Sequence, residues 1–205
     1  MNKLVLSPNA FLKRPTPAYY SLDYVGYDNP GNPDFLNHLK NQFASCSWDL
    51  LLKAYQEACN VLRGDLPQIP RLLKLPVMTV CVVPRAKAEN YYSSNQRLFR
   101  AAVQSVVADC SPVLEDGTDF IQRHTNTRTT HMKKHDSDGE MPYPGITRDT
   151  CELSNRIAGK DILLVDDIYT ATVNVDEDAI QALYDVGAKS VALYAVARTI
   201  PRWWR

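Results

Sequence analysis

The segment from residue 162 to residue 174 constrains the fold of this chain more than any other. It begins with four aliphatic residues, 162–165, continues with Asp166 and Asp167, and passes through a short hydroxyl-bearing loop into a helical pattern. A strand that is apolar on both faces needs cover on both faces, which is typical of a parallel sheet flanked by helices. Ligands of such sheets bind at the carboxyl ends of the strands. The loop after the two acids is therefore the predicted binding site.

The residue types in this loop favour a phosphorylated sugar. Thr170, Thr172 and Asn174 offer side-chain donors, and backbone N–H groups at the start of a helix can hold a phosphate dianion. Asp166 and Asp167 are anionic, so they suit two neighbouring sugar hydroxyls or a hydrated metal ion instead. A phosphate beside vicinal hydroxyls indicates a ribose 5-phosphate. The alternative is an ordinary strand-to-helix turn.

The same residues resemble the phosphoribosyl-pyrophosphate motif of type I phosphoribosyltransferases, which has four apolar residues, two acids and a Thr/Gly-rich loop. The segment is similar to the ComF-like branch of that family, whose loop usually reads Thr-Thr-Gly-x-Thr. This chain has, in its place, Thr170, Ala171, Thr172, Val173 and Asn174. The glycine that tolerates positive φ and a close backbone approach is missing, so the loop is expected to sit differently around a phosphate.

A second strand and its loop carry the same resemblance. Residues 77–83 form another apolar run, and Arg85 and Lys87 follow it in a short loop. In the ComF-like branch the loop at this place binds pyrophosphate, so the resemblance implies that Arg85 and Lys87 hold the pyrophosphate. The alternative is a pair of solvated surface charges.

A polar stretch separates the two motifs. From about residue 124 to residue 150 the chain shows no helical or strand period, and a gap of this length is usually a functional lid or a disordered segment. The family has a loop here that closes over the active site. The ComF-like pattern of an arginine followed by a threonine is matched by Arg123 and Thr127. The resemblance implies that Arg123, Arg128 or Lys133 reaches the ligand on closure.

The remaining segments complete an α/β pattern. Helical spacing is found at residues 35–40, 48–62, 98–106 and 176–186, and a Ser-x-x-Gln capping box lies at residues 93–96. A short strand is expected at residues 119–122 and a buried strand at residues 190–197. Residues 64–76 are expected to form a connector, and residues 1–34 are expected to be irregular with short edge strands. The strands at 77–83, 161–166 and 190–197 are expected to lie side by side.

The predicted fold class is α/β, with a doubly wound, mostly parallel sheet of the type I phosphoribosyltransferase kind and a small N-terminal hood. Residues 1–76 are expected to form the hood and packing helices as part of the same unit. Residues 77–205 are expected to form the phosphoribosyltransferase-like core, with a lid at about residues 124–150.

Composition limits the partners. The chain has 205 residues, enough for one domain, and 23 Lys and Arg residues balance 23 Asp and Glu residues, so the overall charge does not indicate nucleic acid binding. Five widely spaced cysteines are expected to be reduced thiols with no zinc site, and the histidines at 124, 131 and 135 lack the partners of a metal site. No run suggests a membrane span or a signal peptide, so a cytoplasmic location is expected.

The resemblance implies transfer of ribose 5-phosphate from phosphoribosyl pyrophosphate to a nitrogen nucleophile, with release of pyrophosphate. Asp166 and Asp167 would hold the ribose hydroxyls, residues 170–174 the 5-phosphate, and Mg²⁺ would bridge pyrophosphate and ribose. Three acids at residues 176–178 crowd the same helix N-terminus and count against tight phosphate binding, although compensation of the helix dipole is the simpler explanation.

Two other functions stay open. One is a non-catalytic sensor that binds phosphoribosyl pyrophosphate or a nucleotide and acts through a protein partner, which the altered loop favours. The other is an interaction scaffold in DNA uptake or defence, for which the Trp- and Arg-rich tail at residues 201–205 is the only hint. A homodimer is a further possible assembly.

Overall fold

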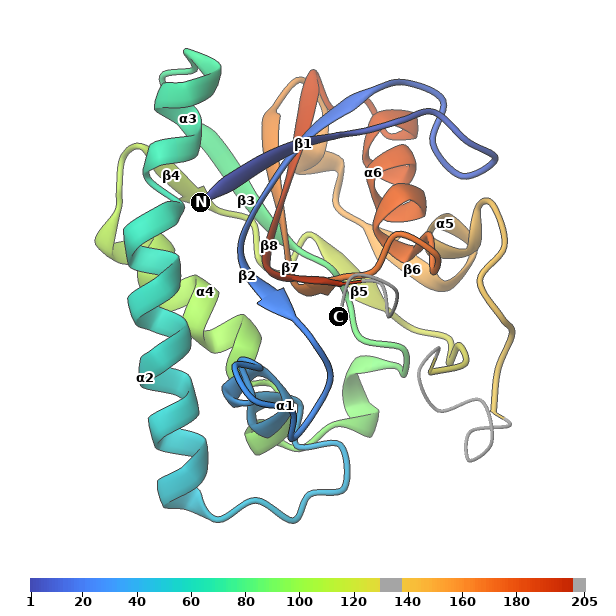
Figure 1. Ribbon diagram of the computed structural model, residues 1–205. Helices are drawn as coiled ribbons and strands as arrows, with labels where there is room; N and C mark the ends of the chain where they lie inside the picture. Colours follow the sequence, from blue (N-terminus) through green and yellow to red (C-terminus); the bar gives the residue numbers. More distant parts are fainter. Residues whose placement is uncertain (130–137, 201–205) are drawn as a thin grey trace.

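Six strands form one sheet in the computed structural model, which describes residues 1–129 and 138–200. The order across the sheet is β1-β2-β8-β7-β3-β4, and every neighbouring pair is parallel except β1 with β2 (Figure 1). The strands are β1 Asn2–Leu6, β2 Thr16–Tyr24, β3 Met78–Val82, β4 Leu114–Asp116, β7 Asp161–Tyr169 and β8 Ser190–Thr199. The predicted α/β class with a mostly parallel sheet is confirmed, and so is the adjacency of β3, β7 and β8.

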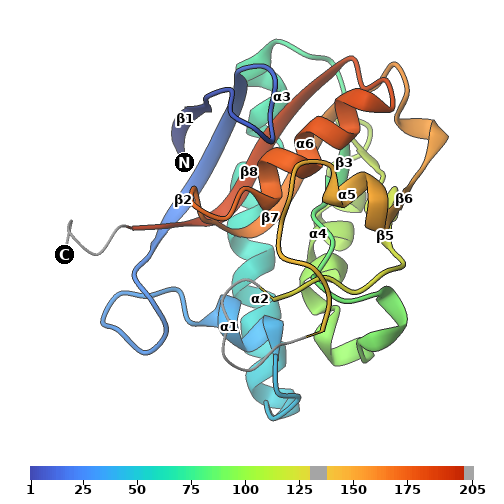
Figure 2. The same ribbon diagram turned by 90° about the vertical axis from the view of Figure 1, so that its right-hand side faces the viewer.

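Helices cover both faces of this sheet. One face carries α1 Phe35–Lys40, α2 Trp48–Asp65, α3 Gln68–Leu73 and α4 Leu98–Asp109, and the other carries α6 Val175–Asp185 with the short α5 Ile146–Thr150 (Figures 1 and 2). A separate pair of antiparallel strands, β5 Ile121–Arg123 and β6 Cys151–Leu153, lies beside α5. Short 3₁₀ turns are η1 Glu89–Tyr91, η2 Ser94–Gln96 and η3 Asn155–Ile157, and the predicted capping box starts η2.

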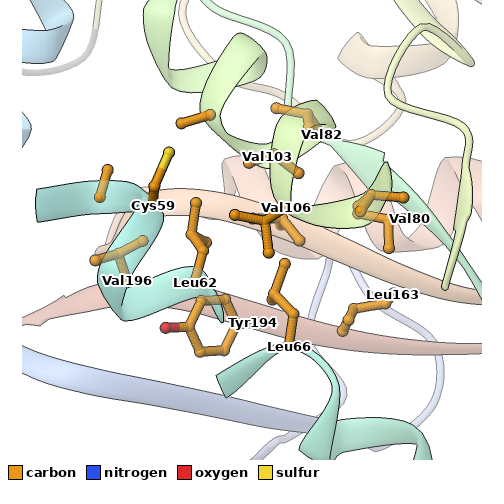
Figure 3. Packing of buried hydrophobic residues seen from close by; sticks show 14 of the residues in the cluster. Cys59, Leu62, Leu66, Val80, Val82, Val103, Val106, Leu163, Tyr194 and Val196 are labelled. Carbon is orange, nitrogen blue, oxygen red and sulfur yellow. The ribbon is translucent and has the colours of Figure 1, made fainter. Parts of the chain in front are cut away.

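The central strands are apolar on both faces because each face has its own core. Along β7, Leu163 and Val165 pack into the cluster beneath α2 and α4, whereas Ile162 and Leu164 pack into the cluster beneath α6. Figure 3 shows the first cluster, in which side chains of α2 and α4 meet those of β3, β7 and β8. This two-sided burial brings the end of β7 into the centre of the molecule.

A polar contact ties α2 to the sheet inside this first core. Asp65, at the end of α2, accepts hydrogen bonds from the hydroxyl groups of Tyr194 on β8 at 2.6 Å and of Ser21 on β2. The Tyr194 side chain is fully buried among leucine and valine side chains (Figure 3). Both hydroxyl groups are therefore satisfied, and the register of α2 on β2 and β8 is fixed.

The N-terminal third is more regular than the sequence predicts. β2 is an internal strand of nine residues, not a short edge strand, and only Pro17 of the five prolines in residues 1–34 lies within it. α3 replaces the expected connector at residues 64–76. Pro67 and Pro70 fall at its N-cap and first turn, where backbone N–H groups have no intrahelical acceptor and proline therefore costs no hydrogen bond.

The polar stretch at residues 124–150 also contains structure that the sequence does not predict. α5, at its end, is five residues long, and β6, which follows the stretch from residue 151, is three residues long, so both are too short for a period to show. Near its start, Thr127 forms a bridge with Glu140 and the Arg128 N–H donates to the Glu140 carbonyl at 2.9 Å. The middle of the predicted lid, residues 130–137 with His131, Lys133 and His135, lies outside the described residues.

Two smaller sequence expectations concern the described part of the chain. All five cysteines lie in it, and each is unpaired. No helix there is long and apolar enough to cross a membrane.

Removing buried volume from β7 is expected to destabilise the whole sheet. Leu163→Ala should lower the free energy of unfolding by about 2–5 kcal/mol, because Leu163 is fully buried between two sheet neighbours and the α2 and α4 layer. Leu72→Ala, on the exposed face of α3, makes the same chemical change and should cost less than about 0.5 kcal/mol. Urea unfolding of both variants measures the difference, and equal losses would contradict the packing described.

Candidate functional site

A cavity opens at the carboxyl ends of β3 and β7 and brings most of the predicted site residues together. Asp166, Asp167, Thr170 and Val173 come from β7 and the loop after it, Arg85 from the loop after β3, and Arg123 from β5; each lines the cavity. Lys40, Arg128 and Asp176 line it too. Four predicted residues do not: Lys87, Ala171, Thr172 and Asn174.

The two acids lie within β7, not after it, and face opposite sides of the sheet. Asp167 forms an ion pair with Lys40 at the end of α1, with 3.2 Å between Nζ and the carboxylate oxygen. Burial alone would lower the pKa of Lys40, but the negative charges of Asp167 and Asp166 outweigh it and raise that pKa. Lys40 therefore stays protonated beside Asp167.

Asp166 faces the first turn of α6, where Asp176 approaches it. Burial first, and then the charge of Asp167, raises the pKa of Asp166 to about 7. Burial first, and then the charge of Asp166, raises the pKa of Asp176 well above its ordinary value. Each of the two acids therefore disfavours ionisation of the other. Asp176 Oδ1 is buried without a hydrogen-bond partner among the described residues.

Arg123 supplies positive charge to the same cavity. Its side chain is 5% exposed; Nε donates to the Arg85 carbonyl at 2.7 Å and Nη1 donates to the Thr150 hydroxyl. Neither acceptor is charged, so the guanidinium charge is not neutralised by its anchors. Arg128 lines the cavity as well, and its Nε is buried with no hydrogen-bond partner in the described part of the chain. Two arginines are thus available to an anion.

The side chains of Arg85 and Lys87, which are predicted to hold pyrophosphate, both bind backbone carbonyl groups of the protein. Arg85 donates to the carbonyl groups of Lys40 at 2.9 Å and Gln96 at 2.5 Å, and it stacks on the Tyr92 ring. It lines the cavity, yet its guanidinium mainly joins the loop after β3 to α1 and η2. Lys87 is buried, and its Nζ donates to the carbonyl groups of residues 127 and 138 at 3.0 and 2.8 Å. Lys87 therefore supports the polar stretch and does not reach the cavity.

The loop at residues 170–174 offers less to a phosphate than the sequence predicts. Ala171 and Thr172 are exposed, the Asn174 side chain is bound to Asn9 at 3.1 Å, and the Thr170 hydroxyl is bound to that of Thr199. The backbone adopts positive φ at Asn174, two residues after the position of the missing glycine, and asparagine tolerates this conformation.

The N-terminus of α6 is occupied by its own acids, as the sequence suggests. Asp176 contacts Asp166, Glu177 accepts a hydrogen bond from the Tyr169 hydroxyl at 2.8 Å, and Asp178 accepts from backbone N–H groups of α5. All three are buried. Negative charge near this helix end is stabilised by the helix dipole. The placement of the three acids therefore fits the simpler explanation, that they compensate the dipole of α6.

A second, more aromatic compartment adjoins the first. Its volume is about 580 Å³, against about 160 Å³ for the first, and the two share Lys40, Gln42, Thr129 and Ile168. Tyr24, Tyr27, His38 and Phe43 line it together with the amide side chains of residues 37, 41 and 42. Rings and amide groups in one hollow suit a planar polar ligand.

Lys40 and Asp176 are the functional candidates that the sequence did not reveal. Lys40 ends a helix far from both motifs, and only the packing of α1 places it beside β7. Asp176 was visible as one of three acids at a helix start, but its spacing cannot tell a residue that faces Asp166 from one that faces solvent. No known family model matches this sequence, and no curated protein matches it either.

The raised pKa values of Asp166 and Asp176 predict an unusual dependence of stability on pH. Between about pH 4 and pH 7 the folded chain holds more protons at Asp166 and Asp176 than the unfolded chain, so stability falls as pH rises through this range. Asp176→Asn removes one of the competing charges and should be more stable than the unchanged protein by roughly 1–2 kcal/mol at about pH 8, with a smaller difference at about pH 5.

Thermal and urea unfolding at several pH values test this expectation. Asp185→Asn, an exposed acid later on α6, is the control and should show no such pH-dependent gain. A destabilised Asp176→Asn at the higher pH would mean that the carboxylates are better compensated than the structure indicates.

Proposed function

We propose that this chain binds phosphoribosyl pyrophosphate with Mg²⁺ and transfers its phosphoribosyl group to a nitrogen nucleophile, as the resemblance to ComF-like type I phosphoribosyltransferases implies. One observation carries the proposal: the adjacent acids at the end of β7 line the same cavity as the buried Arg123, whose two anchors are neutral, and the half-buried Arg128, whose Nε has no partner among the described residues. Vicinal hydroxyls suit the acids and pyrophosphate suits the arginines.

Each group has a role in this reaction. Asp166 and Asp167 accept hydrogen bonds from the ribose hydroxyls, and Arg123 and Arg128 bind the departing pyrophosphate. The transition state resembles an oxocarbenium ion, so the protein contributes mainly orientation and charge stabilisation. The nearby carboxylates favour the positive charge that develops on the sugar, and the arginines favour the negative charge that leaves.

Magnesium belongs to the substrate complex in this proposal. Within residues 1–129 and 138–200 no three His, Cys, Asp or Glu side chains are arranged to hold a metal ion by themselves. Mg²⁺ is commonly held by one or two carboxylates together with substrate phosphates, and Asp166 and Asp167 fit that donor set. Bound in this way it neutralises charge on the leaving pyrophosphate.

The aromatic compartment is the place for the acceptor. It meets the first cavity at Lys40 and Ile168, next to the Asp167 end of β7, so a planar acceptor there would approach the sugar held by the acids. Tyr24 and Tyr27 belong to the segment that the sequence assigns to a substrate hood. Their rings and the amide groups of Asn37 and Gln42 favour a nitrogen heterocycle over ammonia.

A non-catalytic sensor is the second candidate, and the α6 N-terminus favours it. Three acids occupy the place where a 5-phosphate would be held, and Thr172 is exposed. If the 5-phosphate is bound only weakly, the sugar is positioned less precisely, and catalysis depends on that positioning. A scaffold role rests on the tail at residues 201–205, which lies outside the described residues.

Calorimetric titration of phosphoribosyl pyrophosphate with and without Mg²⁺, followed by a pyrophosphate-release assay over a panel of nitrogen bases and amines, tests the proposal. Saturable Mg²⁺-dependent binding with turnover supports the transferase. Binding without turnover on any acceptor supports the sensor. Absence of binding at about pH 8, where Asp166 is ionised, would refute both.

Replacing both acids of β7 separates a ligand role from a structural one. Asp166→Asn with Asp167→Asn should weaken phosphoribosyl-pyrophosphate binding at least about tenfold, because hydrogen bonds to charged groups contribute about 1.5–3 kcal/mol each. The fold should persist, since the Lys40–Asp167 pair is partly exposed and such pairs add little stability.

The matched control is Asp109→Asn, which breaks an ion pair with Arg63 remote from the cavity, with 3.0 Å between the charged atoms. It should leave the affinity unchanged. An unaltered dissociation constant in the double variant would remove the two acids from the ligand site.

A further inference from the structure

The short helix α5 is fixed to the helix that follows the two acids. One carboxylate oxygen of Asp178 accepts from the Gly145 N–H at 2.5 Å, and the other accepts from the Thr147 N–H at 2.7 Å. Asp178 is 1% exposed, so water does not compete for these hydrogen bonds. α5 is therefore anchored to the first turn of α6, although it lies at the end of the polar stretch that the sequence assigns to a lid.

At its other end α5 holds Arg123. The Thr150 hydroxyl donates to the Ile146 carbonyl at 2.5 Å and accepts from Arg123 Nη1. On the opposite edge of the guanidinium, Nε donates to the Arg85 carbonyl at 2.7 Å. Both acceptors are neutral, so they fix the plane of the guanidinium and leave its charge available. Ile146 and Thr147 of the same helix line the cavity beside it.

We propose that Thr150 is a positioning residue, which, with α5 and Asp178 behind it, aims Arg123 at the anionic group of the ligand. The inference rests on the proposed function in that this group is the pyrophosphate of phosphoribosyl pyrophosphate. A guanidinium binds oxyanions through a rigid, planar set of donors. The contribution of Arg123 to anion binding therefore depends on the orientation of its guanidinium. The Thr150 hydroxyl fixes this orientation without neutralising the charge.

Asp178 is a less suitable residue for a first test, because its removal would have two opposite effects on anion binding by Arg123. Burial lowers the pKa of Arg123, and the negative charge of Asp178 is among the influences that oppose this. Removing that charge would strengthen the attraction of Arg123 for an anion, whereas removing the cap would release α5. The Thr150 hydroxyl can be deleted without any change of charge.

The test is calorimetric titration of the full chain with inorganic pyrophosphate and Mg²⁺. Thr150→Val, which keeps the side-chain shape and loses the hydroxyl, should weaken binding about tenfold. Thr150→Ser keeps the hydroxyl and should retain the affinity of the unchanged chain. Arg148→Ala removes an exposed ion pair between α5 and α6, at 3.5 Å from Asp185, and should have no effect.

A double-mutant cycle ties the effect to Arg123. In an Arg123→Ala background, Thr150→Val should change the pyrophosphate affinity no further, because its target is gone. Equal affinities of the Thr150→Val and Thr150→Ser variants per folded molecule would overturn the proposal. A Thr150→Val loss that persists in full without Arg123 would overturn it as well.

Exchange of the Arg123 Nε–H proton, followed by NMR without ligand, separates this inference from the proposed function. The proton should exchange slowly in the unchanged chain and in Thr150→Ser, and faster in Thr150→Val. If the unchanged chain binds no pyrophosphate, the proposed function fails and the exchange rates alone decide whether Thr150 orders Arg123. Equal exchange in all three proteins would show that Thr150 does not position Arg123.

Discussion

Two adjacent carboxylates at the end of a buried strand are the constraint on which the site depends. Because side chains alternate along β7, Asp167 faces α1 and Asp166 faces α6, so Lys40 forms its ion pair with Asp167 and acts on Asp166 through its charge alone. A carboxylate that is largely withdrawn from water costs free energy unless its charge is compensated. Lys40 compensates Asp167 with a positive charge, whereas burial and proximity raise the pKa of both Asp166 and Asp176 and so favour protonation of that pair. The packing of α1 and of α6 against the sheet is thus coupled to the charge state of the cavity.

The positive charge that is left for a ligand comes from two arginines that form no ion pair with either acid. Arg123 is held by two neutral acceptors, and Arg128 Nε is buried without a partner among the described residues. A cavity with acids on one side and uncompensated arginines on another suits a ligand that combines hydroxyl groups with an anion. The α6 N-terminus, by contrast, is filled by its own acids. The ribose and pyrophosphate portions of the proposed substrate therefore have better support than the 5-phosphate.

The long apolar runs were sufficient to predict the sheet, because a strand covered on both faces leaves an unmistakable pattern at β3, β7 and β8. They were also sufficient to place Asp166 and Asp167 at a strand end. The sequence predicts only short edge strands where β2 is a long internal strand, and a connector where α3 lies, because prolines at tolerated positions look like breaks; α5 is not predicted because five residues show no period. Lys87 and Thr172 were assigned to the ligand from their position in a motif, whereas their orientation depends on tertiary contacts. For the same reason Lys40, Asp176 and Thr150 could not be predicted from sequence spacing.

A crystal structure of the chain with phosphoribosyl pyrophosphate and Mg²⁺ tests the central claim most directly. The account predicts ribose hydroxyls hydrogen-bonded to Asp166 and Asp167, the pyrophosphate against Arg123, and loss of the contact between Lys40 and Asp167 if the sugar takes its place. A ligand bound at another surface, or a pyrophosphate held by the loop at residues 170–174 and not by Arg123, would contradict it.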